Sequence, residues 1–168
     1  MDFYGINLTG DLEIDADNQY DIGEVAKRAK VIYAVTFNGE ATSAQWGDLA
    51  EKYTCTEECS VGTVVCVSSD ESVDLEPCTE DLSSAYVGVI SAAPGFIMNA
   101  KLEDGEVVGL VGRLPVDIRG PIKKGDFIVP TVYGCARAGL EGEEQYKIGV
   151  CNENKSTEEN ALVECIIK

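Results

Sequence analysis

Residues 106–129 read EVVGLVGRLPVDIRGPIKKGDFIV, and this stretch decides the fold class. Aliphatic and β-branched residues dominate 106–111, and residues 114–118 (LPVDI) alternate apolar with less apolar side chains. Alternation with a period of two is typical of a strand that buries one face. Residues 124–126 (KGD) are a turn signal, and the apolar run 127–129 follows them directly. The stretch therefore predicts three short strands that are joined by turns.

The same pattern extends to both sides of this stretch. Further short strands are predicted at residues 61–67, 86–91, 134–138, 146–150 and 162–167. Glycine-containing turns separate them, and the second half of the chain contains no convincing long helix. We therefore expect a mainly β protein whose residues 54–168 form a compact antiparallel β-barrel or sandwich domain.

Residues 7–53, which precede this domain, differ from it in composition. They are polar, with isolated apolar strands such as 31–37, which the tight-turn signal Asn38-Gly39 follows. Residues 43–53 (SAQWGDLAEKY) are the best candidate for a short helix. A lone hairpin is only marginally stable, and the few apolar residues of this region do not suffice to form a hydrophobic core of its own. We expect a fibre-like β segment that becomes stable when sister copies intertwine, which makes the protein a homo-oligomer.

Composition excludes several classes of function. Lysine and arginine total 13 against 30 aspartates and glutamates, which gives a formal net charge of −17. Binding to nucleic acid or to an anionic membrane needs a cationic surface, so neither partner is expected. The sequence has no histidine, which removes Ser-His-Asp and Cys-His catalysis and the HExxH metal site. Residues 1–10 lack the features of a signal peptide, and we expect a soluble protein made in the cytoplasm, without catalysis and without a cofactor.

Seven cysteines are present: Cys55, Cys59, Cys66, Cys78, Cys135, Cys151 and Cys165. Zinc sites usually need two close pairs, and only Cys55 and Cys59 are close in sequence, so no metal site is predicted. Cys66 and Cys165 lie in apolar strands, where reduced and buried thiols are expected. Cys55, Cys59 and Cys78 lie among polar residues and are expected to be exposed. These three are the candidates for a structural disulfide, within one chain or between chains.

Several motifs resemble those of a known family. Residues 20–23 (YDIG), 30–34 (KVIYA) and 36–44 (TFNGEATSA) are similar to a repeat in the tail fibres of tailed bacteriophages. Residues 46–53 (WGDLAEKY) resemble a signature that precedes their C-terminal β-domain, and the similarity continues to residue 168. The resemblance implies a homotrimeric structural protein of the virion, in contact with other proteins of the capsid, neck or tail. The short chain points to a short fibre, a collar or tail appendage, or a capsid decoration.

The resemblance also leaves alternatives open. The region of residues 48–51 (DLAE) is shared with the autoproteolytic domain at the ends of phage tail-spike and pre-neck appendage proteins. A receptor-binding module that recognises the host surface is a further alternative, for which an exposed aromatic groove would be the sign. Asp48 and Glu51 would lie on one face of a short helix, but with 30 acidic residues such proximity is expected by chance.

The sequence offers candidate contact residues for such an assembly. Residues 1–6 are expected to be an attachment segment in which Phe3 and Tyr4 anchor the chain to the particle. The candidates for contacts between copies are Ile22, Tyr33, Phe37, Trp46 and Leu49. The second half of the chain also contains a group of basic residues, Arg113, Arg119, Lys123 and Lys124. These cations either contact an acidic partner or neutralise the chain's own carboxylates.

Overall fold

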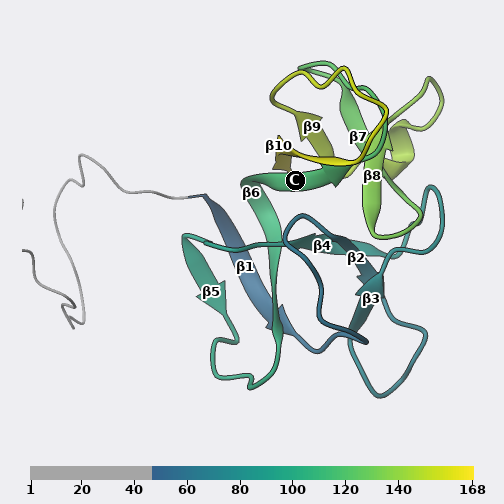
Figure 1. Ribbon diagram of the computed structural model, residues 1–168. Coiled ribbons are helices and arrows are strands. Elements are labelled where there is room, and N and C mark those ends of the chain that lie inside the picture. Colours follow the sequence, from purple (N-terminus) through teal and green to yellow (C-terminus); the bar gives the residue numbers. More distant parts are fainter. Residues whose placement is uncertain (1–46) are drawn as a thin grey trace, which may run out of the picture. The chain divides into compact units, whose positions relative to one another are not determined.

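The computed structural model describes residues 47–168, which form an almost entirely β structure (Figure 1). The strands are β1 (Asp48–Tyr53), β2 (Val64–Val67), β3 (Leu75–Pro77), β4 (Tyr86–Ile90), β5 (Phe96–Met98), β6 (Glu106–Ile118), β7 (Phe127–Thr131), β8 (Cys135–Ala138), β9 (Gly149–Cys151) and β10 (Ala161–Ile167). The helical part of these residues is the short 3₁₀ turn η1 (Glu144–Tyr146). No helix within 47–168 has the length and apolar character needed to cross a membrane.

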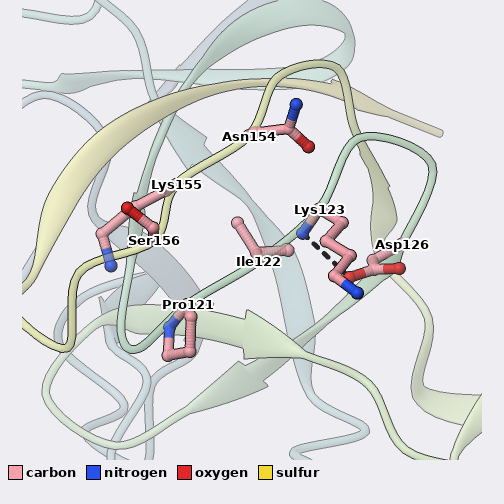
Figure 2. Close-up of a pocket in the computed structure, with 7 residues that line it drawn as sticks. All are labelled: Pro121, Ile122, Lys123, Asp126, Asn154, Lys155 and Ser156. Atoms are coloured by element: carbon pink, nitrogen blue, oxygen red, sulfur yellow. Dashed lines mark hydrogen bonds between the residues drawn. The ribbon is translucent and has the colours of Figure 1, made fainter.

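Five strands close into a barrel. β6 pairs with β10, β10 with β9, β9 with β7, β7 with β8, and β8 returns to β6 through the parallel pair Ile118↔Ala136. The loop after β6 lies against the loop after β9, where Ile122 and Lys155 exchange two backbone hydrogen bonds of 2.8 and 2.9 Å (Figure 2). Because the ring of strands is closed, it leaves no free strand edge with which another strand could pair.

The remaining strands extend from the first half of β6. β4 pairs with β6, β2 with β4, and β3 with β2, while β1 pairs antiparallel with β6 and parallel with β5. Gly112 is the residue at which β6 changes partners, because it lies opposite Asp48 of β1 and also opposite Ile167 of β10. Its φ of 129° gives the strand the bend that joins the two parts.

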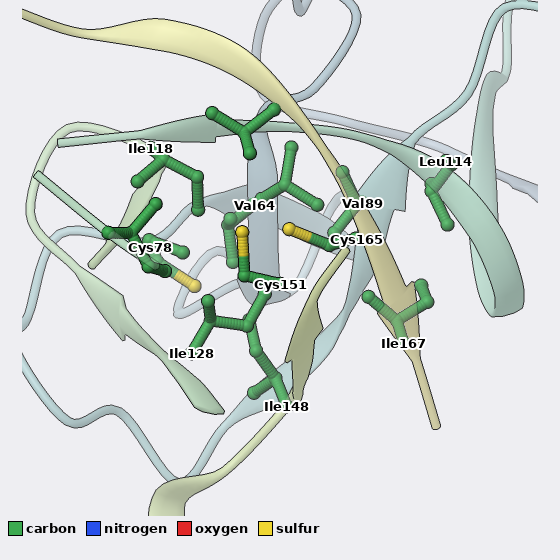
Figure 3. Close-up of a cluster of buried hydrophobic side chains, with 14 of the residues drawn as sticks. Val64, Cys78, Val89, Leu114, Ile118, Ile128, Ile148, Cys151, Cys165 and Ile167 are labelled. Carbon is green, nitrogen blue, oxygen red and sulfur yellow. The ribbon is translucent and has the colours of Figure 1, made fainter. Parts of the chain in front are cut away.

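The core fills the barrel and continues under β2 and β4. Figure 3 shows Ile118, Ile128, Ile167 and Val64 converging in it, and all four side chains are fully buried. Each such side chain contributes about 1.5–3 kcal/mol by leaving water. A second, smaller cluster of Val65, Leu75, Ile90 and Val108 lies between the outer strands.

The predicted β-barrel is confirmed, and most of its predicted strands have counterparts. The helix predicted at 43–53 is wrong over the part that the structure describes, because Asp48–Tyr53 is strand β1. Leu49, Ala50 and Glu51 pair with Phe96, Ile97 and Met98 on one side, and β6 lies on the other. Two neighbouring strands thus outweigh the local helical propensity of these residues.

Three further differences concern strand bounds and coverage. The separate strands predicted at 106–111 and 114–118 are one strand, β6. Strands β3 and β5 were not predicted, since each is only three residues long. The predicted attachment segment 1–6, the strands before residue 43, and the contact candidates Phe3, Tyr4, Ile22, Tyr33, Phe37 and Trp46 lie outside the described residues.

Candidate functional site

An apolar hollow of about 350 Å³ lies at the start of the described chain. Its walls come from the beginning of β1, the start of β5 and the bend of β6: Gly47, Asp48, Leu49, Phe96, Val111 and Gly112. The Phe96 side chain is 57% exposed and that of Val111 is 43% exposed. We call the six lining residues together the β1–β5 surface. Because exposed apolar side chains gather around this hollow, it is a candidate contact site for another protein surface.

Backbone pairing fixes the geometry of the β1–β5 surface. The Gly95 N–H donates to the Asp48 carbonyl at 2.9 Å, and the Arg113 N–H donates to the Gly47 carbonyl at 2.9 Å. Among the described residues β5 pairs with β1 alone, so its other edge has no partner strand. The surface therefore combines an apolar wall with an open strand edge, and both features favour pairing with another chain.

Asp48 is the buried acidic residue of this surface. Its side chain lies over Gly109, whose Cβ, if present, would be 2.6 Å from Asp48 Oδ2. That oxygen is buried and has no hydrogen-bond partner among residues 47–168. Glu51 does not share this environment: burial alternates along β1, and the Glu51 carboxylate accepts a hydrogen bond of 2.9 Å from the Tyr53 hydroxyl. The imagined carboxylate pair on one helix face is therefore absent from this strand.

A second hollow, of about 560 Å³, lies between the loops after β6 and β9 (Figure 2). Lys123, Asp126, Asn154 and Lys155 line it together with Pro121, Ile122 and Ser156. The Lys123 N–H donates to the Asp126 carboxylate at 2.9 Å, and the Lys155 ammonium donates to the carbonyls of Gly120 and Thr157. The bond from Lys155 to Gly120 ties the loop after β9 to the loop after β6, and the other two bonds each lie within one loop.

The basic residues in the second half of the chain lie in different environments. Arg113 lies 3.8 Å from the Glu164 carboxylate, which agrees with its role in neutralising the chain's own acids. Lys123 and Lys124 lie at the second hollow and its turn, where the Lys124 N–H donates to Asn154 at 2.9 Å. In the described part of the chain no group of three or more Cys, Asp or Glu residues has metal-binding geometry.

The cysteines differ from expectation in one important pair. Cys66 and Cys78 form a disulfide with a Cα–Cα distance of 5.1 Å, and both are buried. Cys78 was expected to be exposed, and Cys66 to be reduced, and both expectations are wrong because the β2–β3 hairpin brings the two residues together. Cys55 and Cys59 are free and half-buried, with their Sγ atoms 3.6 Å apart. Cys165 is buried as predicted.

Sequence reasoning found one member of the β1–β5 surface, Leu49, and missed Phe96 and Val111. Phe96 follows Ala93-Pro94-Gly95, a sequence that predicts a turn, and its strand has only three residues. A lone exposed aromatic residue after a turn gives no periodic signal. Phe96 is also the one aromatic residue in the two hollows described above, so an aromatic-lined groove for a receptor does not form there.

Comparisons with known proteins place the fold. No family model matches the sequence, and no curated protein matches it. The structure is similar to the C-terminal fragment of gene product 12 of bacteriophage phi29, with a TM-score of 0.56 and 18% identity over 72% of this chain and 100% of that fragment. The pre-mature form of the same gene product 12 aligns with a TM-score of 0.57 and 18% identity over 74% of this chain.

The match covers only 22% of the pre-mature chain, so this protein corresponds to a small part of it. The TM-scores of 0.56 and 0.57 show a shared fold, and at 18% identity the similarity shows the fold alone. Function has to be argued separately, from the surface and the motifs.

Proposed function

We propose that this protein is a structural component of a bacteriophage virion, such as a short fibre, a collar or tail appendage, or a capsid decoration, and that it acts as a homotrimer. The observation that carries the proposal is the fold shared with a bacteriophage protein fragment over that fragment's full length. The tail-fibre-like motifs in residues 20–53 also support the proposal, because that resemblance rests on sequence whereas the comparison rests on the fold.

The β1–β5 surface supports assembly from copies of this chain. Phe96 and Val111 expose apolar area that a solitary subunit leaves in water, and burial of apolar area drives association. We propose that contacts through the β1–β5 surface join the copies.

Sedimentation of the full chain tests the oligomeric state. A homotrimer has a mass of three times 18.0 kDa at micromolar concentration. A single 18.0 kDa species at high concentration contradicts the trimer. Antibodies against the full chain test the location separately, since they should label one feature of purified particles of the encoding phage. Absence of the chain from particles contradicts the virion role even if the protein is trimeric.

A self-cleaving domain is the second candidate, and Asp48 favours it. Asp48 has a buried carboxylate oxygen with no hydrogen-bond partner among residues 47–168, and such a group is available as a nucleophile or general base. If Asp48 serves self-cleavage, the denatured protein shows a fragment that begins near Gly47, and Asp48→Asn abolishes this fragment. An intact mass of 18.0 kDa after prolonged incubation argues for the structural role alone.

A further inference from the structure

Two free cysteines face each other in the loop that joins β1 to β2, at an acidic hollow that this loop forms with residues 104–106. Cys55 follows the end of β1, Cys59 lies four residues later, and their Sγ atoms are 3.6 Å apart. The hollow has a volume of about 470 Å³ and is lined by Cys55, Glu57, Glu58, Asp104, Gly105 and Glu106. A disulfide bond has a length of about 2.05 Å, so modest side-chain rotation brings the two sulfurs together.

The backbone already holds both cysteines in place. Cys55 lies beside Leu75 of β3, where the Thr56 N–H donates to the Leu75 carbonyl at 3.1 Å and the Leu75 N–H donates to the Thr54 carbonyl at 3.0 Å. The Cys59 N–H donates to a carboxylate oxygen of Glu106 at 3.3 Å. Both side chains also pack against the smaller core cluster. Because the loop is anchored at each cysteine, closing a bond between them costs little additional order.

The other three free cysteines do not compete for this reaction. Cys135 is buried and lies against Asp117 and Asn160, with no thiol beside it. Cys151 and Cys165 face each other across β9 and β10 and are also buried, as Figure 3 shows. A reagent that approaches the folded protein from solvent therefore meets Cys55 and Cys59 first.

We propose that Cys55 and Cys59 are a modification site, at which the folded protein forms a second intrachain disulfide by exchange with a small disulfide RSSR. One protein thiolate attacks RSSR, forms a mixed disulfide and releases RS⁻. The second thiolate then attacks the protein sulfur of the mixed disulfide, which forms the ring and releases another RS⁻. The protein loses two hydrogens, and RSSR is reduced to two molecules of RSH.

A second observation supports exposure of this protein to oxidants. Cys66 and Cys78 are already joined in the neighbouring β2–β3 hairpin. Disulfides persist in oxidising surroundings and are rare in reducing cytosol. The Cys55–Cys59 pair is therefore expected to meet the same oxidants, with the difference that it is open to solvent.

The lining of the hollow selects the kind of oxidant. Glu57, Glu58, Asp104 and Glu106 surround the thiols with negative charge, which repels anionic disulfides and attracts cationic ones. Burial, the hydrogen bond that the Cys59 thiol shares with Cys55, and the nearby Glu106 and Glu57 charges raise the pKa of the Cys59 thiol well above its usual range. Since the thiolate is the attacking species, exchange is slow near neutrality and accelerates with rising pH.

The test exposes the folded full chain to cystamine, a dicationic disulfide, and separately to anionic oxidised glutathione, at about pH 8. After denaturation and alkylation, intact mass counts the free thiols. The untreated chain has five free cysteines, so formation of one bond leaves 5 − 2 = 3. We expect cystamine to react at least about tenfold faster than oxidised glutathione at low salt, and the ratio to fall when salt screens the carboxylates.

Three variants serve as controls. Cys135→Ser should close the ring at the wild-type rate. Cys55→Ser and Cys59→Ser should each stop at a mixed disulfide on the remaining thiol of the pair, which shows that the site is reachable. Survival of the buried Cys135, Cys151 and Cys165 thiols in the same sample shows that the variant is folded. The proposal is overturned if all five thiols survive cystamine, or if both cysteines carry separate adducts without ring closure. It is also overturned if peptide mapping joins either cysteine to another position or to a second chain.

Discussion

Among residues 47–168, Arg137 ties separate segments of the chain together through two ion pairs. Its guanidinium forms paired hydrogen bonds of 2.9 and 2.8 Å to the Asp81 carboxylate and further bonds of 2.8 and 3.0 Å to Glu143. It thus joins β8 to the loop after β3 and to the turn before η1. Its side chain is 22% exposed, so water screens these bonds only in part. Planar, bidentate contacts of this kind are among the stronger polar interactions in proteins.

Replacing Arg137 is expected to change both stability and its dependence on pH. Hydrogen bonds from Arg137 lower the pKa values of Asp81 and Glu143. The stabilisation is therefore present above the ordinary carboxyl pKa of about 4 and is lost as pH falls through the lower values of the folded state. Arg137→Met should reduce the free energy of unfolding by about 2 kcal/mol at pH 7. Denaturant titrations should show the difference from wild type shrinking below about pH 4.

Arg113→Met is the matched control, because Arg113 is exposed and lies 3.8 Å from its partner Glu164. A surface pair at this distance contributes less than about 0.5 kcal/mol. If Arg137→Met reduces the free energy of unfolding by the same amount at pH 3 as at pH 7, the charges of Asp81 and Glu143 do not cause the loss.

At the scale of elements, β6 is the strand on which both halves of the fold depend. Its first half pairs with β1 and β4, and its second half pairs with β10. The change of partner occurs at Gly112, where a Cβ would lie 2.6 Å from both Asp48 Cα and the Gly47 carbonyl oxygen. These are backbone atoms, so they have little freedom to move away.

Gly112→Ala is expected to be strongly destabilising. The backbone has a φ of 129°, which L side chains rarely adopt, and the clash adds to this strain. We expect a loss of about 2–4 kcal/mol in chemical denaturation. Gly125→Ala is the control, since its φ is also positive at 96° while nothing lies within 4 Å of the added Cβ. Equal losses in the two variants would show that the close approach of β1 to β6 is unimportant.

The elements also show which parts of the fold are predictable from local sequence. β2, β4, β7 and β10 are rich in β-branched or alternating apolar residues, and their positions follow from that pattern. β1 reads DLAEKY, which favours a helix locally, and only its neighbours β5 and β6 make it a strand. Long-range pairing carries no signature within a short window, and this explains the error.

The same limit applies to the candidate sites. Cys78 is followed by Thr79 and Glu80, so its local sequence predicts exposure, although the hairpin buries it against Cys66. Phe96 and Val111 are 15 positions apart in the sequence numbering and meet only because β1 lies between β5 and β6. Leu49 could be named from its motif, whereas its two companions required the strand order.

For the whole molecule, charge and apolar contact have opposite effects on association. Each copy has a net charge of −17, so three copies repel one another, and salt screens this repulsion. The proposed trimer must therefore be held by apolar burial, for which the β1–β5 surface is the candidate. It follows that added salt should strengthen assembly, whereas an assembly held by ion pairs between copies would weaken.

Substitutions on the β1–β5 surface test this balance directly. Phe96→Ser and Val111→Ser remove exposed apolar area, so each should leave the fold of the subunit intact while weakening self-association by about tenfold or more. Leu140→Ser is the control, because Leu140 is 63% exposed and lies outside this surface. Sedimentation at about 20 and 300 mM salt should show more trimer at the higher concentration for wild type and Leu140→Ser. If Phe96→Ser and Val111→Ser sediment as wild type does, the copies meet elsewhere; if salt dissociates the trimer, ion pairs rather than apolar contacts join them.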